Sequence, residues 1–304
     1  MTEFVPYFQA AWLPVLGSQL QAVGVQTLAV KLVDYERQPG FNLINQAGGL
    51  KSLLNWSGQL MTLAGDFAPV RKVKKNLAKT GIHYQDPQNQ AKLTLTPATY
   101  QQWQTATKAE ITVGMFQNPD YYAPVDDLER AMQANIEWNQ GASATFLPVL
   151  GAGLKALRQA SIAALPNNIG AFITNLPPVA ELTEWQRSLE LTLKLLPKGT
   201  STAVVAPNLA TIELSQKLGI DYILSAWPLK QGLGGKALVD GEVVNLRHQA
   251  FGGQFSPLEA GCNCPACTGF TRASLHAMLH AKEPLASRLL LLHNVKEIIK
   301  QTGK

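Results

Sequence analysis

The chain has 304 residues, of which 46% are apolar and 15% are charged, so it is long enough to bury one large core. It shows no signal peptide, no apolar stretch of membrane-spanning length and no low-complexity linker, and we therefore expect a cytoplasmic protein that does not enter a membrane. The 26 Lys and Arg residues exceed the 21 Asp and Glu residues, and this net charge of +5 is compatible with a polyanionic partner without requiring one.

Eight short runs of β-branched or apolar residues recur along the chain, with helical patterns between them. Strand–helix alternation at this spacing predicts a parallel sheet, and eight repeats can close it into a (β/α)8 TIM barrel, an α/β fold. The predicted strands are 4–8, 27–33, 59–63, 111–116, 144–150, 171–176, 202–206 and 222–227, and the clearest helices are 124–139, 153–164, 182–195 and 209–218.

Two segments interrupt this alternation. Residues 82–96 are predicted to form a small strand pair around Asp86-Pro87, and residues 236–248 a hairpin that turns at Asp240-Gly241. Insertions of this kind usually lie on loops, and we expect both at one rim of the barrel.

All three cysteines lie within six positions, and a histidine follows after 25 residues: Cys262, Cys264, Cys267 and His293. An odd cysteine count in a reducing cytoplasm argues against a disulfide. Three thiolates and one imidazole are a complete tetrahedral set for a closed, structural Zn²⁺ site. The alternative for the cysteines is that they are ordinary core residues, and the alternative for His293, on the apolar face of a late helix, is likewise a core residue. We expect residues 252–304 to form a zinc-binding segment packed on the barrel, within one domain spanning 1–304.

Basic residues concentrate in two places. One run after the third predicted strand contains Arg71, Lys72, Lys74, Lys75 and Lys79 with no acid between them. The segment after the last cysteine is also basic, with Arg272, Lys282, Arg288, Lys296, Lys300 and Lys304. Each is either a solvated helix face or a surface that contacts phosphates.

Five short motifs, spread along the chain, can be compared as one set with those of known families. They are PGF at 39–41, AGGL at 47–50, DLER at 127–130, LGIDY at 218–222 and RLLLLHN at 288–294. With the C-x-C-x₂-C-x₂₅-H spacing, they resemble the tRNA-guanine transglycosylases, also called queuine or archaeosine tRNA-ribosyltransferases, over nearly the whole chain. The resemblance implies a zinc-containing (β/α)8 barrel of a family that exchanges a guanine in tRNA for a modified or precursor base. It also favours His293 as the fourth zinc ligand.

The chain departs from that family at the positions of the catalytic and base-contacting residues. The position of the family's carboxylate nucleophile holds Leu224, and that of its general acid/base holds Leu63. The positions that contact the base in the family correspond here to Gln117, Leu150, Gly151, Ile173 and Thr174. Leucine has neither a nucleophilic lone pair nor a titratable proton, so we expect no catalysis of the family reaction.

Two aspartates near the predicted strand ends are candidate replacements. Asp66 follows Leu63 by three positions, and Asp120 follows Gln117 by three. Either side chain would lie at the barrel mouth, where barrel enzymes carry their active sites. The alternative is that both are ordinary turn aspartates.

Three functions remain open. The first is an accessory subunit that binds tRNA and forms a homodimer, or a heterodimer with a catalytic transglycosylase; it predicts that both basic segments share one side with the barrel mouth. The second is an active tRNA-ribosyltransferase or related base-exchange enzyme with a relocated carboxylate. The third is a stand-alone RNA-binding or regulatory protein, which predicts salt-sensitive tRNA binding without base exchange.

Overall fold

Eight parallel strands form the centre of the molecule in the computed structural model, which describes residues 2–9, 12–74, 76–86 and 91–302. Their order is β6-β3-β2-β1-β10-β9-β8-β7, and a parallel bridge between Val113 and Phe146 joins the two edges. The predicted (β/α)8 barrel is therefore confirmed. The strands are β1 (Glu3–Phe8), β2 (Thr27–Lys31), β3 (Gln59–Leu63), β6 (Ile111–Thr112), β7 (Phe146–Val149), β8 (Gly170–Ile173), β9 (Thr202–Val205) and β10 (Tyr222–Ser225).

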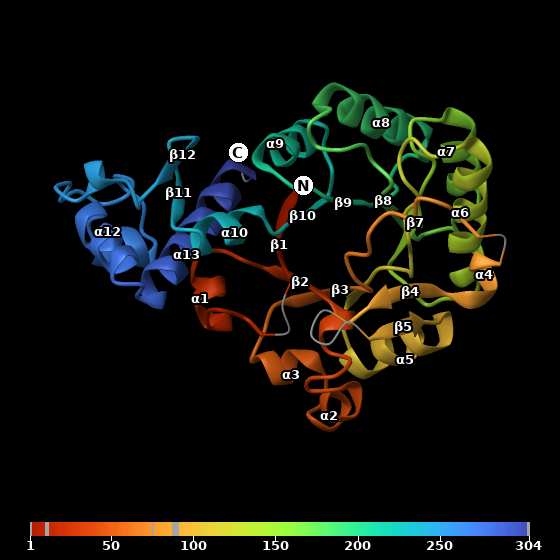
Figure 1. The fold of residues 1–304 in the computed structure, drawn as a ribbon, viewed down its shortest axis with the longest axis horizontal. Helices are drawn as coiled ribbons and strands as arrows, with labels where there is room; N and C mark the ends of the chain where they lie inside the picture. Colours follow the sequence, from red (N-terminus) through yellow and green to blue (C-terminus); the bar gives the residue numbers. More distant parts are fainter. Residues whose placement is uncertain (1, 10–11, 75, 87–90, 303–304) are drawn as a thin grey trace.

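Helices surround this ring of strands (Figure 1). The four that the sequence predicts most clearly are α6 (Val125–Trp138), α7 (Lys155–Ala163), α8 (Leu182–Leu195) and α9 (Leu209–Lys217). The others around the barrel are α1 (Gly17–Ala22), α2 (Phe41–Gln46), α3 (Leu50–Leu54), α4 (Leu77–Thr80), α5 (Pro97–Thr107) and α10 (Trp227–Leu233), with a 3₁₀ turn η1 (Leu32–Asp34) after β2. No helix in the described part of the chain has the length and apolar character needed to cross a bilayer.

The inside of the barrel is filled by apolar side chains. Neighbouring strands contribute in turn, because alternate residues of each strand point inward. The buried members of this cluster are Val5, Tyr7, Ala29, Met61, Leu63, Ile111, Val113, Phe146, Phe172, Ala203 and Leu224. The interior is thus a packed core and not a channel.

Six of the eight strands end before their predicted last residue, and β6 ends earliest relative to the prediction. Residues 111–116 are predicted as a strand, but β6 ends at Thr112. Beyond it, Met115 bonds with the side chain of Asn139 at the end of α6, which accepts from the Met115 N–H at 2.9 Å and donates to its carbonyl at 2.8 Å. The amide of Asn139 therefore takes the place of a neighbouring strand.

Both predicted hairpins are present. The first pairs β4 (Ile82–Gln85) with β5 (Lys92–Leu95), although Pro87 in its expected turn lies outside the described residues. The second pairs β11 (Lys236–Val239) with β12 (Glu242–Asn245). Its turn residues Asp240 and Gly241 both have positive φ, +50° and +84°, as a two-residue hairpin turn requires.

The C-terminal residues form a lobe at one side of the barrel (Figure 1). It contains the 3₁₀ turn η2 (Gln249–Phe251), α11 (Pro265–Gly269), α12 (Arg272–His280) and α13 (Pro284–Thr302). Helix α13 packs closely on α10: a Cβ atom at Gly232 would lie 2.3 Å from the backbone nitrogen of Leu291. Glycine at 232 therefore sets the distance between the barrel and the lobe.

Candidate metal centre and barrel mouth

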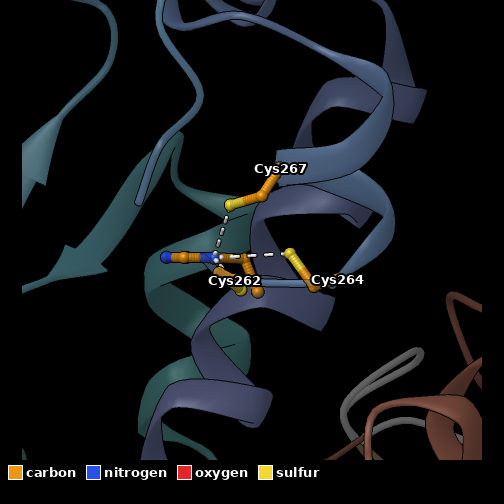
Figure 2. A group of neighbouring side chains, drawn as sticks. Cys262, Cys264 and Cys267 are labelled. Carbon is orange, nitrogen blue, oxygen red and sulfur yellow. Dashed lines mark hydrogen bonds between the residues drawn. The ribbon is translucent and has the colours of Figure 1, made fainter. Parts of the chain in front are cut away.

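The four predicted zinc ligands meet in the C-terminal lobe. Cys262 precedes α11, Cys264 caps it, Cys267 lies within it and His293 lies midway along α13. The sulfur atoms of the three cysteines are 3.8, 3.4 and 3.5 Å from Nδ1 of His293, in that order. Figure 2 shows the three labelled sulfur atoms turned toward one point, and all four donor atoms lie within 4.8 Å of one another. This cluster could hold a metal ion.

The histidine is oriented by a backbone carbonyl. Its Nε2 lies 2.8 Å from the Leu238 carbonyl oxygen on β11, which leaves Nδ1 to face the sulfur atoms. The adjacent Asn294 holds the same hairpin, because its Oδ1 accepts from the Leu238 N–H at 2.8 Å and its Nδ2 donates to the Lys236 carbonyl at 3.0 Å. The sequence alone predicted no role for Asn294. Its place beside His293 at the end of the RLLLLHN motif was the signal that could have suggested one.

The protonation of this cluster is set by the neighbouring ligands. A hydrogen bond with Cys267, supported by another with His293, lowers the pKa of the Cys264 thiol, whereas the same bond raises the pKa of Cys267. Burial opposes charge on His293, but bonds with Cys262 and Cys264 raise its pKa to about 10. A bound Zn²⁺ ion would take the place of the protons that the donor atoms carry without it.

The two residues predicted to stand at the family's catalytic carboxylate positions lie inside the barrel core. Leu63 ends β3 and is 1% exposed, and Leu224 in β10 is fully buried. Leu224 pairs in register with Val5 of β1, and both belong to the apolar interior cluster. Neither position therefore carries a group that could donate a proton or attack a ribose carbon.

Of the five residues predicted to stand at the family's base-contacting positions, four are closed by packing or by the backbone. Leu150 and Ile173 are 1% exposed, and Thr174 shares hydrogen bonds of 2.7 and 3.0 Å with the Asn118 amide. Gly151 has φ of +137°, and a Cβ atom there would lie 2.6 Å from the Arg158 nitrogen. Gln117, 7% exposed, is the fifth and lines a cavity at the barrel mouth.

A buried arginine holds two of the mouth loops. Arg158 on α7 is fully buried and donates to four carbonyl oxygens at 2.8 to 3.0 Å, those of Val149, Ala152, Thr174 and Asn175. Burial lowers its pKa to about 10. Sequence reasoning missed this residue, because an arginine in an amphipathic helix reads as a solvated side chain.

The two candidate replacement aspartates have different surroundings. Asp66 accepts hydrogen bonds from the Tyr7 hydroxyl at 2.7 Å and from the Gln9 amide at 2.8 Å. It lines the same cavity as Gln117. Asp120, which is exposed as Asp66 is, accepts from the Tyr122 N–H at 2.9 Å within its own turn and does not line that cavity.

The basic segments lie far apart along the molecule. The first leads into α4, at one end of the long axis in Figure 1, and the second occupies α12, near the other end, and α13, which runs back to the barrel. Within the described residues, none of Arg71, Lys72, Lys74 and Lys79 forms an ion pair, and Lys75 lies outside them, as does Lys304.

The second basic segment is partly engaged in the lobe. Lys300 lies 2.6 Å from Glu259 and 3.3 Å from Glu297. Arg272 donates to the carbonyls of Pro257 and Leu258 at 3.1 and 2.6 Å. These two cations stabilise the loop before the cysteines, so they are less available to an external phosphate than the run at 71–79.

The sequence matches known proteins over almost its full length. The family model described as queuine tRNA-ribosyltransferase matches residues 3–303. A queuine tRNA-ribosyltransferase of Prochlorococcus marinus strain MIT 9303 is 29% identical over 301 residues, covering 95% of this chain and 81% of the relative. One from strain MIT 9211 is 27% identical, covering 93% and 80%, and one from Synechococcus elongatus is 28% identical, covering 95% and 79%.

Proposed function

Because the chain belongs to the queuine tRNA-ribosyltransferase family, we propose that it serves tRNA modification as a catalytically silent subunit that binds tRNA. The observation that carries the proposal is the apolar barrel interior. Leu63 and Leu224 are 1% and 0% exposed among other apolar side chains. Loss of a nucleophile and its acid/base partner costs several orders of magnitude in rate, so the family's base exchange would not proceed there.

The proposed cofactor is one structural Zn²⁺ ion, held by Cys262, Cys264, Cys267 and His293. The donor set of three thiolates and one imidazole is complete for tetrahedral zinc and leaves no place for a reactive water. Its role would be to hold α11 against α13, and so to make residues 252–304 one folding unit with the barrel in a single domain spanning 1–304.

The two basic segments lie far apart (Figure 1) and do not form the shared surface expected for an accessory subunit, so we place the tRNA contact at the basic run 71–79 alone. Its described cations are unpaired, and they follow β3 at the end of the barrel where the mouth lies. Neutralising phosphates with such side chains releases counterions, so binding would weaken as salt rises. In a heterodimer, an intact transglycosylase would supply the base-exchange chemistry. In a homodimer there would be no catalytic partner, and the protein would act alone in binding tRNA or in regulation.

A second candidate function rests on Asp66. This carboxylate lines a cavity of about 730 Å³ together with Gln117, so a base-exchange enzyme with a relocated carboxylate is the alternative. Both oxygens of Asp66 already accept hydrogen bonds, which reduces its strength as a nucleophile. Asp120 has no comparable claim, because it does not line this cavity.

The experiment that separates these functions is exchange of labelled guanine into bulk tRNA by the purified, zinc-loaded protein. An intact relative serves as positive control. We expect no incorporation by the chain alone, and incorporation that disappears in an Asp66→Asn variant would establish the relocated enzyme instead. A third arm adds the chain to a limiting amount of an intact transglycosylase; enhanced exchange would favour the heterodimer.

A further inference from the structure

Two histidines lie one turn apart on α12, in the C-terminal lobe. His276 and His280 are separated by four positions, and residues with this separation share one face of a helix. Their ring centroids are 4.4 Å apart, and the ring planes are inclined by 57°. Neither residue belongs to the cysteine cluster, and the proposed function gives neither of them a role.

One nitrogen atom of each ring is held by a backbone carbonyl group. Nδ1 of His276 lies 2.7 Å from the Leu246 carbonyl oxygen, and Nε2 of His280 lies 3.1 Å from the Arg247 carbonyl oxygen. A carbonyl oxygen can only accept a hydrogen bond, so each of these two nitrogens carries the proton. In a neutral imidazole the other nitrogen then has a free lone pair. The free lone pairs are therefore on Nε2 of His276 and on Nδ1 of His280.

Metal-binding histidines in proteins have the same kind of arrangement. Such a histidine almost always donates its second ring N–H to a carbonyl or carboxylate group, which fixes the tautomer and the orientation of the ring. Two histidines at positions i and i+4 of one helix are a known zinc-binding pair. Because a bond from imidazole nitrogen to zinc is about 2.0 to 2.1 Å long, two rings at this separation are close enough to bind one ion together.

The surroundings of the two rings leave room for an ion. His280 is exposed, and His276 is half-buried beneath Gly252, where a Cβ atom would lie 3.6 Å from Nε2. Because glycine has no side chain, this nitrogen stays open. The Arg247 guanidinium group is turned toward other acceptors, with Nε 3.4 Å from the Gly234 carbonyl oxygen and Nη1 3.1 Å from that of Leu279.

We propose that His276 and His280 bind one divalent transition-metal ion through these two nitrogens, with water completing its coordination. Imidazole nitrogen suits Zn²⁺, Ni²⁺ and Cu²⁺, whereas Mg²⁺ and Ca²⁺ prefer oxygen ligands. With two protein ligands, one of them exposed, the ion exchanges with solvent, unlike an ion in the closed cysteine cluster. It would stabilise the contact between α12 and residues 246–247, whose carbonyl groups hold both rings. This inference goes beyond the proposed function and does not rest on it.

The test is isothermal titration with Zn²⁺ of zinc-loaded protein that has been dialysed against metal-free buffer. Dialysis leaves the ion of the cysteine cluster in place and empties the exchangeable site, so the titration measures only the second ion. We expect one further ion to bind. His276→Ala and His280→Ala should each weaken its binding at least about tenfold, because even the loss of a ligand's outer hydrogen-bond partner costs that much. His83→Ala, which removes an exposed histidine of β4, is the matched control.

A second pair of variants tests the geometry while keeping both histidines. Gly252→Leu should cover Nε2 of His276 and weaken Zn²⁺ binding, and its φ of −62° accepts a side chain. Gly253→Leu is the control, because a Cβ atom there meets no other atom within 4 Å. Thermal melting checks that all variants fold. Absence of a second ion, or wild-type affinity for it in both folded histidine variants, would overturn the proposal. Equal weakening by the two leucine variants would contradict the assigned ligand atom.

Discussion

The C-terminal lobe contains the metal-ligand set that the family resemblance predicts, whereas the barrel interior lacks the carboxylates that it predicts. In the lobe, the donor atoms of four side chains that could hold a metal ion lie within 4.8 Å of one another. In the barrel, Leu63 and Leu224, which the sequence predicts at the family's carboxylate positions, are 1% and 0% exposed. The cysteine cluster joins α11 and the loop before it to α13, so a bound metal ion would add to the apolar packing that already holds these segments together. A carboxylate buried inside an apolar barrel lowers the stability of the fold, and without a catalytic use it brings no benefit in return. Leucine is therefore the more stable residue at such a position.

The largest effect should follow from breaking the metal cluster. Cys264→Ala or His293→Ala should release zinc and unfold the lobe, because structural zinc contributes on the order of 10 kcal/mol to a site of this kind. Zinc content and circular dichroism measure both results. His280→Ala is the matched control, since this exposed histidine lies outside the cluster. Normal zinc content in both cluster variants would refute the ligand assignment.

The opposite change would restore the family's carboxylates to the barrel. Leu63→Asp with Leu224→Asp should lower the free energy of unfolding by about 3 to 5 kcal/mol at neutral pH and should not restore guanine exchange. Burial raises the pKa of each new carboxyl, so folding favours the protonated form and stability should fall as pH rises through that pKa. The uncharged pair Leu63→Asn and Leu224→Asn should lack this slope. Measurable turnover by the aspartate variant would mean that the pocket has kept its base recognition.

A third prediction concerns the loops at the barrel mouth whose carbonyl groups bind Arg158. Arg158→Met should cost about 2 to 4 kcal/mol, because four carbonyl oxygens lose a shared donor. Urea unfolding measures the change, and faster amide exchange near Ala152 and Asn175 would locate it. Arg187→Met, an exposed arginine of α8, should cost less than about 1 kcal/mol. Equal effects of the two substitutions would contradict a structural role for Arg158.

The smallest effect should come from Asp34 at the cavity wall. Burial raises the pKa of its carboxyl, against a smaller opposing effect of Lys31. Since the folded-state pKa exceeds the unfolded one, the favourable contribution is complete below about pH 4 and is lost as pH rises through the folded-state pKa. The Asp34→Asn variant lacks this titration. Above about pH 4, its free energy of unfolding should therefore fall less with rising pH than that of the wild type, by about 1 kcal/mol or less. A steeper curve in the variant would contradict the sign of the shift.

Local patterns predicted the repeating part of the fold well. The eight strands follow from apolar runs, and the turn of β11–β12 follows from Asp240-Gly241, because period and turn chemistry are properties of neighbouring residues. The end of β6 could not be predicted, since it depends on Asn139, 24 positions from its partner Met115.

The candidate site divides in the same way. Cysteine spacing predicted the metal cluster because three of its four ligands lie within six residues. The mouth cavity could not be predicted, because its hairpin is fixed by Arg37 and Asp86, 49 positions apart. The buried position of Arg158 likewise depends on carbonyl groups of two separate loops and leaves no mark in the helix sequence.

The most direct test of a silent, tRNA-binding barrel is to run one mixture of zinc-loaded protein and tRNA on a native gel and on a denaturing gel. The family nucleophile would hold tRNA covalently through a carboxylate, which Leu224 cannot do. We predict a salt-sensitive complex on the native gel and free tRNA only on the denaturing gel, with an intact transglycosylase giving a stable adduct. A tRNA adduct of this chain that survives denaturation would contradict the account.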